Sequence, residues 1–115
     1  MIEEGDIALL NFPQADGKLG KVRPVLIIVK TPGRYDDWLV CMISSQLSQC
    51  VSQFDETVSE TDSDFESSGL KKASIIRLGR IAVVSRDLLP GSIGRIKTVR
   101  QTRIRRRIAE WIKPD

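Results

Sequence analysis

The residues Val25 to Val29 are apolar at every position, and Arg23-Pro24 stands directly before them. A strand with one face in water alternates apolar and polar residues, whereas an unbroken apolar run is typical of a strand covered on both faces. The sequence therefore predicts a strand from Arg23 to Lys30, with the core on one face and another layer or subunit on the other. Thr31-Pro32-Gly33 ends it. The arginine at its head has no part in an apolar core.

Three further segments have the composition of long strands. Asp6 to Phe12 ends at Pro13, whose missing N–H cannot continue a ladder. Trp38 to Ile43 is a second such segment, and Ala73 to Val84 is a third. Gly79 lies inside the last of these and predicts a bulge, because glycine in a strand interior often marks one.

Shorter elements connect these strands. Residues 14–21 carry an Asp-Gly turn signal and two lysines, which predicts a mobile, basic hairpin loop. Residues 47–70 are polar and acidic but contain recurring apolar residues, which favours an irregular edge strand with loops over disorder. We expect one helical turn over Ser85 to Leu89, a turn at Pro90-Gly91 and a short strand over Ile93 to Ile96.

One helix is predicted after residue 97. Thr98-x-x-Gln101 has the form of a capping box. The apolar residues that follow at near-helical spacing form a predicted core stripe: Val99, Ile104, Ile108, Trp111 and Ile112. The remaining face is either a solvated surface or a contact surface for an acidic partner, and it carries Arg100, Arg103, Arg105, Arg106 and Arg107.

Several strands with short turns and one terminal helix predict a mainly β fold, in which a strongly bent sheet or small barrel packs against the helix. The chain has 115 residues, the usual size of one domain, and no linker or repeat divides it. We therefore expect a single domain over residues 1–115.

The residue types that are missing narrow the chemistry. The chain has no histidine, which excludes Ser/His and Cys/His nucleophiles and most zinc sites. Cys41 and Cys50 lack a CxxC or Cys/His pattern and are interpreted as free structural thiols. No cofactor is expected. The start lacks the features of a signal peptide and no apolar run approaches the ~20 residues of a membrane span, so we expect a cytoplasmic protein.

Charge is distributed unevenly along the chain. Residues 1–70 contain 5 Lys and Arg against 12 Asp and Glu, whereas residues 71–115 contain 13 against 3. This polarity indicates either a polyanionic partner for the basic part or a fold in which the two halves neutralise each other. Six of the carboxylates lie between Asp55 and Glu66, in a stretch whose role the pattern does not assign.

Polar residues at the ends of the predicted strands form a candidate site. In a curled sheet such strand ends can share one rim, and sites are often built there. The residues are Asp16, Gly17, Lys18 and Lys21 in the first loop, Arg23, then Ser44, Ser45 and Gln46, and Arg77 or Arg80 on the long strand.

RNA is a ligand that these residue types suit. Its 2′-OH can attack the neighbouring phosphate, so a protein need only position the strand, move protons and neutralise the phosphorane oxygens. The planar fork of Arg23 can bind two phosphate oxygens and donate a proton to the leaving 5′-oxygen, while Ser44 adds a hydrogen bond. Arginine is a poor base, so the acceptor of the 2′-OH proton is not assigned. The alternative is structural: Arg23 solvates the strand end or pairs with Asp6 or Asp16.

Several segments, in their order along the chain, resemble a known family. They are Gly5-Asp6-Ile7, Phe12-Pro13, Asp16-Gly17, Lys21-x-Arg23-Pro24-Val25-Leu26-Ile27-Ile28, Ile43-Ser44-Ser45-Gln46, Gly69-Leu70, Ser74-x-Ile76-Arg77, Arg80-Ile81 and Ile93-Gly94. This order is similar to that of the PemK/MazF family of type II toxin–antitoxin toxins, and the resemblance spans nearly the whole chain.

The resemblance implies an SH3-like small β-barrel with a C-terminal α-helix, a homodimer, and metal-independent, sequence-selective cleavage of single-stranded mRNA. Arg23 matches the family's catalytic arginine. Ser44 matches a position that is commonly threonine, and serine keeps the hydroxyl but loses the methyl that restricts its rotamer. The predicted RNA-binding residues are Asp16, Gly17, Lys18, Lys21, Ser45, Gln46, Arg77 and Arg80; of these, Gln46 and the loop from Asp16 to Lys21 match positions near the family's RNA channel.

The family also implies an antitoxin whose acidic, partly disordered tail lies in the RNA channel, where a basic rim suits both ligands. Two alternatives remain open. The first is a non-enzymatic toxin that resembles CcdB and binds DNA gyrase through an aromatic residue near the C-terminus, such as Trp111. The second is an inactive nucleic-acid-binding regulator, whose binding would weaken with salt while the RNA stays whole.

Overall fold

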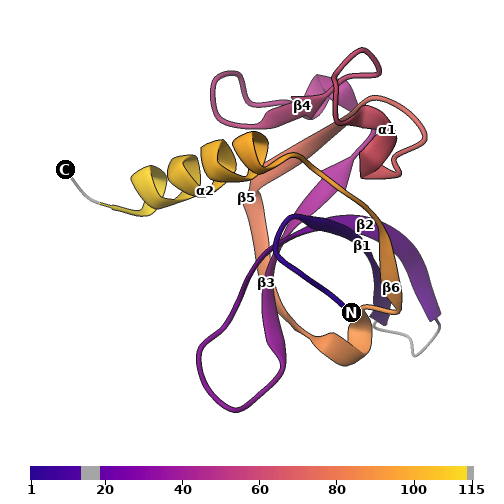
Figure 1. The fold of residues 1–115 in the computed structure, drawn as a ribbon, viewed down its shortest axis with the longest axis vertical. Coiled ribbons are helices and arrows are strands. Elements are labelled where there is room, and N and C mark those ends of the chain that lie inside the picture. Colours follow the sequence, from indigo (N-terminus) through magenta and orange to yellow (C-terminus); the bar gives the residue numbers. More distant parts are fainter. Residues whose placement is uncertain (14–18, 114–115) are drawn as a thin grey trace.

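The computed structural model describes residues 1–13 and 19–113. Within them, six strands form one curled antiparallel sheet, a half-barrel, in the order β4-β5-β3-β2-β1-β6 (Figure 1). The elements are β1 (Asp6–Pro13), β2 (Leu19–Lys30), β3 (Asp37–Ser44), η1 (Leu47–Gln49), β4 (Glu56–Val58), α1 (Phe65–Ser68), β5 (Ser74–Ser85), η2 (Arg86–Leu88), β6 (Gly91–Arg95) and α2 (Thr98–Ile112). The predicted mainly β fold with a C-terminal helix is confirmed.

The position of β2 inside the sheet explains its unbroken apolar sequence. Leu26 and Ile28 lie in a buried cluster together with the inner face of α2. Val25 and Ile27 point to the opposite face and lie in a second buried cluster, to which Ile2 contributes. The prediction that this strand is covered on both faces is confirmed, and the same chain supplies both covers.

The predicted bulge is present in β5. Adjacent residues Cys41 and Met42 of β3 pair with Ile81 and Arg77, which leaves residues 78–80 outside the regular ladder. The central residue of these three is the glycine that the sequence indicated. A bulge bends its strand and redirects side chains. Arg80 lies in the bulge and departs from the regular alternation of β5, whereas Arg77 still pairs with Met42.

The β1–β2 connection and the acidic segment differ in detail from prediction. β2 begins at Leu19 rather than at Arg23, so the last residues of the predicted loop belong to a strand that pairs with β1. Residues 14–18 of that loop lie outside the described residues. Segment 47–70 contains an edge strand, β4, as predicted, and also the short helix α1, which the sequence analysis did not predict.

Helix α2 is present, but the predicted capping box is wrong. The N-cap is Lys97, whose backbone N–H donates to a carboxylate oxygen of Asp64 at 3.2 Å. The side chain of Gln101 does not reach back to a cap; its Nε2 donates to the carbonyl of Ile96 at 2.9 Å. A carboxylate from a distant segment therefore replaces the local cap that the sequence suggested.

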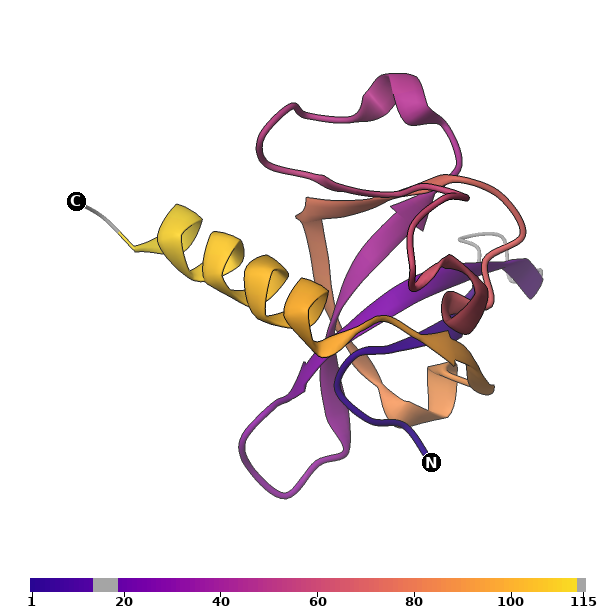
Figure 2. The same ribbon diagram turned by 45° about the horizontal axis from the view of Figure 1, so that its top comes forward.

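The predicted apolar stripe of α2 is only partly buried. Ile104 and Ile108 are buried, whereas Val99, Trp111 and Ile112 are 67%, 51% and 63% exposed. For the last two the reason is geometric, because the C-terminal half of α2 extends beyond the strands (Figure 2). Trp111 packs edge-on against Phe54, with ring centroids 5.5 Å apart.

In the part of the chain described, no helix combines the length and apolar character that a membrane crossing requires.

Candidate functional site

The candidate site is built where β2 begins its pairing with β3 and where β3 ends. The ladder pairs Val25 with Met42 and pairs Met42 with Arg77 across β3 and β5. Two residues further along the antiparallel strands, Arg23 and Ser44 stand on the same face of the sheet, because side chains alternate with period two. The sheet thus brings a cation and a hydroxyl together from distant parts of the sequence.

Two pockets adjoin this strand end. They have volumes of about 530 and 350 Å³ and share Arg23, Pro24, Ile43, Ser44 and Gln46, which we call the rim. Side chains along a strand point alternately to its two faces. The smaller pocket is lined by Met42 and Arg77, and the larger one by Ser74, which points to the opposite face of the sheet. The two pockets therefore lie on opposite sides of the rim. Arg23 and Ser44 therefore stand at the boundary between the two pockets and line both.

The smaller pocket, here the arginine pocket, contains Gln49, Arg77 and Arg80 beside the rim. A chain of hydrogen bonds crosses it. Arg77 Nη1 donates to Gln49 Oε1, Gln49 Nε2 donates to Gln46 Oε1, and the backbone N–H of Gln46 donates to Ser44 Oγ, each at 3.1 Å. Because Ser44 Oγ accepts this bond, its own O–H remains a donor for a ligand.

Arg77 has unused hydrogen-bonding capacity. Its Nε is buried and has no partner among the described residues. A buried donor without a partner costs free energy, and in native structures such an atom often has a functional role or binds a water or an ion. The side chain of Arg77 lines the arginine pocket, where the rest of its guanidinium can bind an anion.

The larger pocket, here the lysine pocket, combines apolar walls with cations. Leu9, Leu70 and Ile93 give it apolar surface, and Lys71 and Lys72 line it from the segment between α1 and β5. No carboxylate appears among the described residues that line either pocket. The rim and both pockets therefore form a groove of positive charge, which suits an anionic ligand.

Most of the predicted site residues come together in this groove. Arg23, Ser44 and Gln46 line both pockets, Ser45 lines the lysine pocket, and Arg77 and Arg80 line the arginine pocket. Lys21 is exposed on β2 and lines neither of these two pockets. Asp16, Gly17 and Lys18 lie outside the described residues.

Sequence reasoning missed Gln49, Lys71 and Lys72. Gln49 follows the polar run Ser44-Ser45-Gln46 by only three residues, and the two lysines directly follow Gly69-Leu70. A search for polar residues beside these motifs would have found them.

The predicted alternative for Arg23, pairing with Asp6, is not what the structure shows. Asp6 instead accepts from Arg95 at 3.0 Å.

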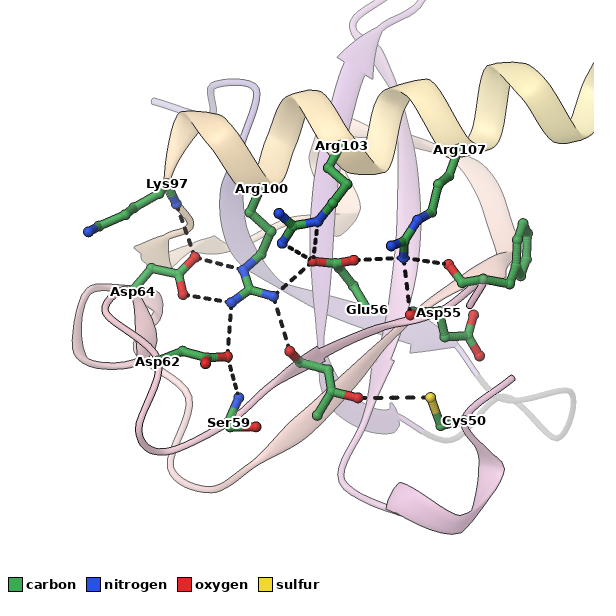
Figure 3. A network of polar contacts seen from close by, with 12 residues as sticks. Cys50, Asp55, Glu56, Ser59, Asp62, Asp64, Lys97, Arg100, Arg103 and Arg107 are labelled. Atoms are coloured by element: carbon green, nitrogen blue, oxygen red, sulfur yellow. Dashed lines mark hydrogen bonds and ion pairs between the residues drawn. The ribbon is translucent and has the colours of Figure 1, made fainter. Parts of the chain in front are cut away.

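The acidic stretch that sequence left unassigned binds helix α2 (Figure 3). Arg100 is 7% exposed, and all five of its N–H donors find acceptors. They are two oxygens of Asp64 at 2.8 and 3.0 Å, Asp62 at 3.0 Å, Glu56 at 3.1 Å and the carbonyl of Thr57 at 3.0 Å. The expectation that Arg100 lies on a solvated or partner-binding face is wrong, because this chain supplies the acidic partner.

Two more arginines of α2 join the same network. Glu56, itself buried, also pairs with Arg103 and with Arg107, the latter at 2.7 Å. The hydrogen bond from Arg100 lowers the pKa of Asp64 below its ordinary value. The hydrogen bond to Glu56 raises the pKa of Arg103.

The two cysteines are free thiols, as predicted. Burial raises the pKa of the Cys41 thiol to about 12, and the charge of Asp55 adds to this effect. The thiol therefore stays protonated and behaves as a small apolar side chain of the core. Among the described residues, no group of three or more His, Cys, Asp and Glu side chains is arranged to hold a metal ion.

Comparisons with known proteins agree with this architecture. The solved structure of the Mycobacterium tuberculosis toxin MazF-mt6 is similar, with a TM-score of 0.66 and 18% sequence identity, over 96% of this chain and 98% of that chain. At this identity the likeness bears on the fold alone. A search of curated proteins found no match. The family model described as PemK-like, MazF-like toxin of type II toxin-antitoxin system matches residues 3–112. This chain therefore belongs to the PemK-like, MazF-like toxins of type II toxin–antitoxin systems.

Proposed function

We propose that this toxin is a metal-independent, sequence-selective endoribonuclease that cuts single-stranded mRNA. The observation that carries the proposal is the shared rim, where Arg23 and Ser44 stand between two basic pockets. Family membership supports an RNA substrate and an antitoxin partner. The groove supports the same reading, because a phosphate backbone needs several cations that are not already neutralised.

The reaction needs no nucleophile from the protein. The 2′-oxygen attacks the adjacent phosphorus, the bond from phosphorus to the 5′-oxygen breaks, and the products are a 2′,3′-cyclic phosphate and a 5′-hydroxyl. Arg23 binds the non-bridging oxygens with its fork and donates a proton to the leaving 5′-oxygen, and its guanidine then regains a proton from water. A guanidinium donates and does not accept protons, so the 2′-OH proton passes to solvent in the open groove.

Ser44 serves as a second donor to the same phosphate. Its Oγ is oriented by the N–H of Gln46 at 3.1 Å, which leaves the hydroxyl hydrogen to point at a ligand. Arg77 and Arg80 bind the strand on the side of the arginine pocket. Asp16, Gly17, Lys18 and Lys21 remain RNA-binding candidates from the β1–β2 connection, and Ser45 and Gln46 from the end of β3.

The decisive experiment incubates purified toxin with a long RNA in EDTA and maps the new ends. We expect cleavage at short recurring sequences, with cyclic phosphate ends, and no cleavage of a strand that carries 2′-deoxy nucleotides. Arg23→Ala should slow cleavage by about 10²–10³-fold, the usual effect of removing one donor to developing oxyanion charge. Cleavage by this variant at the wild-type rate would overturn the assigned mechanism.

The gyrase-binding alternative is favoured by one observation, the half-exposure of Trp111 near the C-terminus. It predicts growth arrest with intact mRNA and altered DNA supercoiling. Trp111→Ala separates the two functions, because it should abolish toxicity in that case and leave RNA cleavage in EDTA unchanged in ours. Arg23→Ala should have the opposite pattern.

A further inference from the structure

We propose that the lysine pocket binds a nucleotide that flanks the scissile phosphate, with its base on the apolar walls and its backbone phosphate on Lys71 and Lys72. The inference rests on the proposed function, because it assigns the RNA a path across the rim. It adds two residues and a base subsite that the strand-end motifs did not include.

The first argument is chemical. The pocket volume of about 530 Å³ lies within the ~300–1,000 Å³ of small-ligand sites. Leu9, Leu70 and Ile93 offer an apolar surface for the face of a base, and Gln46 and Ser45 offer hydrogen bonds to its edge. Single-stranded RNA is usually recognised in this way, by unstacked bases that leave the strand.

The second argument is electrostatic. Lys71 and Lys72 are both exposed, and neither forms an ion pair with another residue that the structure describes. The acidic segment that neutralises α2 does not line this pocket. Two unneutralised cations beside an apolar wall match a phosphate next to a base.

The third argument concerns rigidity. Gly69 ends α1 with a φ of +75°, and a Cβ at Gly69 or Gly94 would collide with the backbone of β6 or α1. Ser67 Oγ also donates to the carbonyl of Arg95 at 2.9 Å. Helix α1 is therefore pressed on β6, and the residues that follow it form a fixed wall of the pocket.

The fourth argument comes from the reaction. In-line attack requires the 2′-oxygen, phosphorus and 5′-oxygen to align, which a stacked strand does not allow. A rim with a pocket on each side draws the two neighbouring nucleotides apart. RNA fits the lysine pocket better than an acidic peptide, because apolar walls suited to the face of a base stand beside its cations.

The test measures binding of single-stranded 12-mers of mixed sequence in 2′-fluoro RNA, which lack the attacking hydroxyl. Lys71→Ala/Lys72→Ala should bind more weakly, and the slope of log affinity against log salt should fall by about 0.7, because the two lysines share one phosphate and each single-strand phosphate contact contributes ~0.7. The matched control is Arg106→Ala/Lys113→Ala, which removes two exposed cations elsewhere and should leave the slope unchanged.

A second variant tests the base subsite. Ile93 is 38% exposed, so Ile93→Ala should fold normally. On a random RNA pool it should change the base preference at one position beside the cut and leave the salt slope unchanged. An unchanged slope in the lysine variant, or an unchanged base profile in Ile93→Ala, would overturn the subsite.

The outcomes separate this inference from the nuclease assignment. A lysine-dependent slope without cleavage by wild-type toxin would retain the RNA subsite and refute the nuclease. Cleavage by wild-type toxin, with the lysine variant unaltered in RNA binding, would retain the nuclease and refute the subsite. Loss of antitoxin inhibition alone in the lysine variant would refute it too, because the pocket would then serve an acidic peptide.

Discussion

The arginines of α2 and the cations of the groove have the same charge but opposite surroundings. Arg100, Arg103 and Arg107 pair with carboxylates of residues 56–64. In the groove, Arg77 pairs only with the neutral amide of Gln49 among the described residues. Part of the uneven charge along the sequence is therefore neutralised inside the fold, and part of what is left over lies in the groove, where β2 and β3 meet.

This difference teaches that positive charge is a poor guide to a ligand until its partners are known. On residue counts, the five arginines of α2 are the denser basic cluster. A buried ion pair has already lost its hydration and gained fixed partners, so it contributes to structure and is not available to RNA. The sparser cations of the groove retain their capacity to bind a polyanion.

The largest effect should come from breaking the α2 network. Arg100→Ala leaves Asp64 buried without its main partner and takes one of three arginines from Glu56. Breaking a buried pair in this way typically costs about 3–5 kcal/mol of unfolding free energy. Urea denaturation measures this loss. Arg106→Ala, on the exposed face of the same helix, is the control and should change stability by less than about 0.5 kcal/mol. Equal stability of the two variants would mean that the network is not structural.

The next largest effect should come from the groove, in activity rather than stability. Arg23→Lys retains the charge but loses the planar fork, so one of two charged hydrogen bonds to the phosphate is lost. At about 1.5–3 kcal/mol for such a bond, kcat should fall roughly 10- to 100-fold. The melting temperature should not change, because Arg23 is exposed. If Arg23→Lys cleaved RNA as fast as wild type, a positive charge alone would be sufficient at the rim.

The sequence predicted the strands well because their signals are local. The apolar run of β2, the glycine in the β5 bulge and the polar residues at the end of β3 each report their own surroundings. The convergence of Arg23, Ser44 and Arg77 followed, since strand ends in a curled sheet share an edge.

The predictions that were wrong concerned features that depend on residues far away in the sequence. Arg100 counted as polar in the helical pattern, and its burial depends on carboxylates such as Asp64 and Glu56, 36 and 44 residues earlier. The same carboxylate replaces the predicted capping box. Trp111 and Ile112 fit the apolar stripe, but the C-terminal half of the helix extends past the sheet that would cover them. Lys71 and Lys72 follow the short α1, which had no clear sequence signal.

Acid should act on the α2 network before it acts on the groove. The pKa of Asp64 is lowered by its hydrogen bond from Arg100, so this carboxylate contributes stability above the ordinary carboxyl range near pH 4. The contribution is lost as pH falls through the lowered pKa. Denaturation curves between pH 7 and pH 2.5 should show the loss in wild type and a smaller one in Asp64→Asn. If the stability of wild type and of Asp64→Asn fell equally with pH, Asp64 would not be the source of this pH dependence.

The smallest effect should come from the hydrogen-bonded chain across the arginine pocket. Gln49→Ala removes the link that joins Arg77 to Gln46. Because this link is exposed to water, its loss should cost about 0.5–1.5 kcal/mol, which corresponds to a roughly 2- to 10-fold change. We expect it in kcat, because a free Arg77 still attracts RNA but no longer has a fixed direction. Ser48→Ala, in the same turn and equally exposed, is the control. If Gln49→Ala instead raised KM alone, Gln49 would contact the RNA directly. The groove would then bind RNA through a neutral amide as well as through its cations.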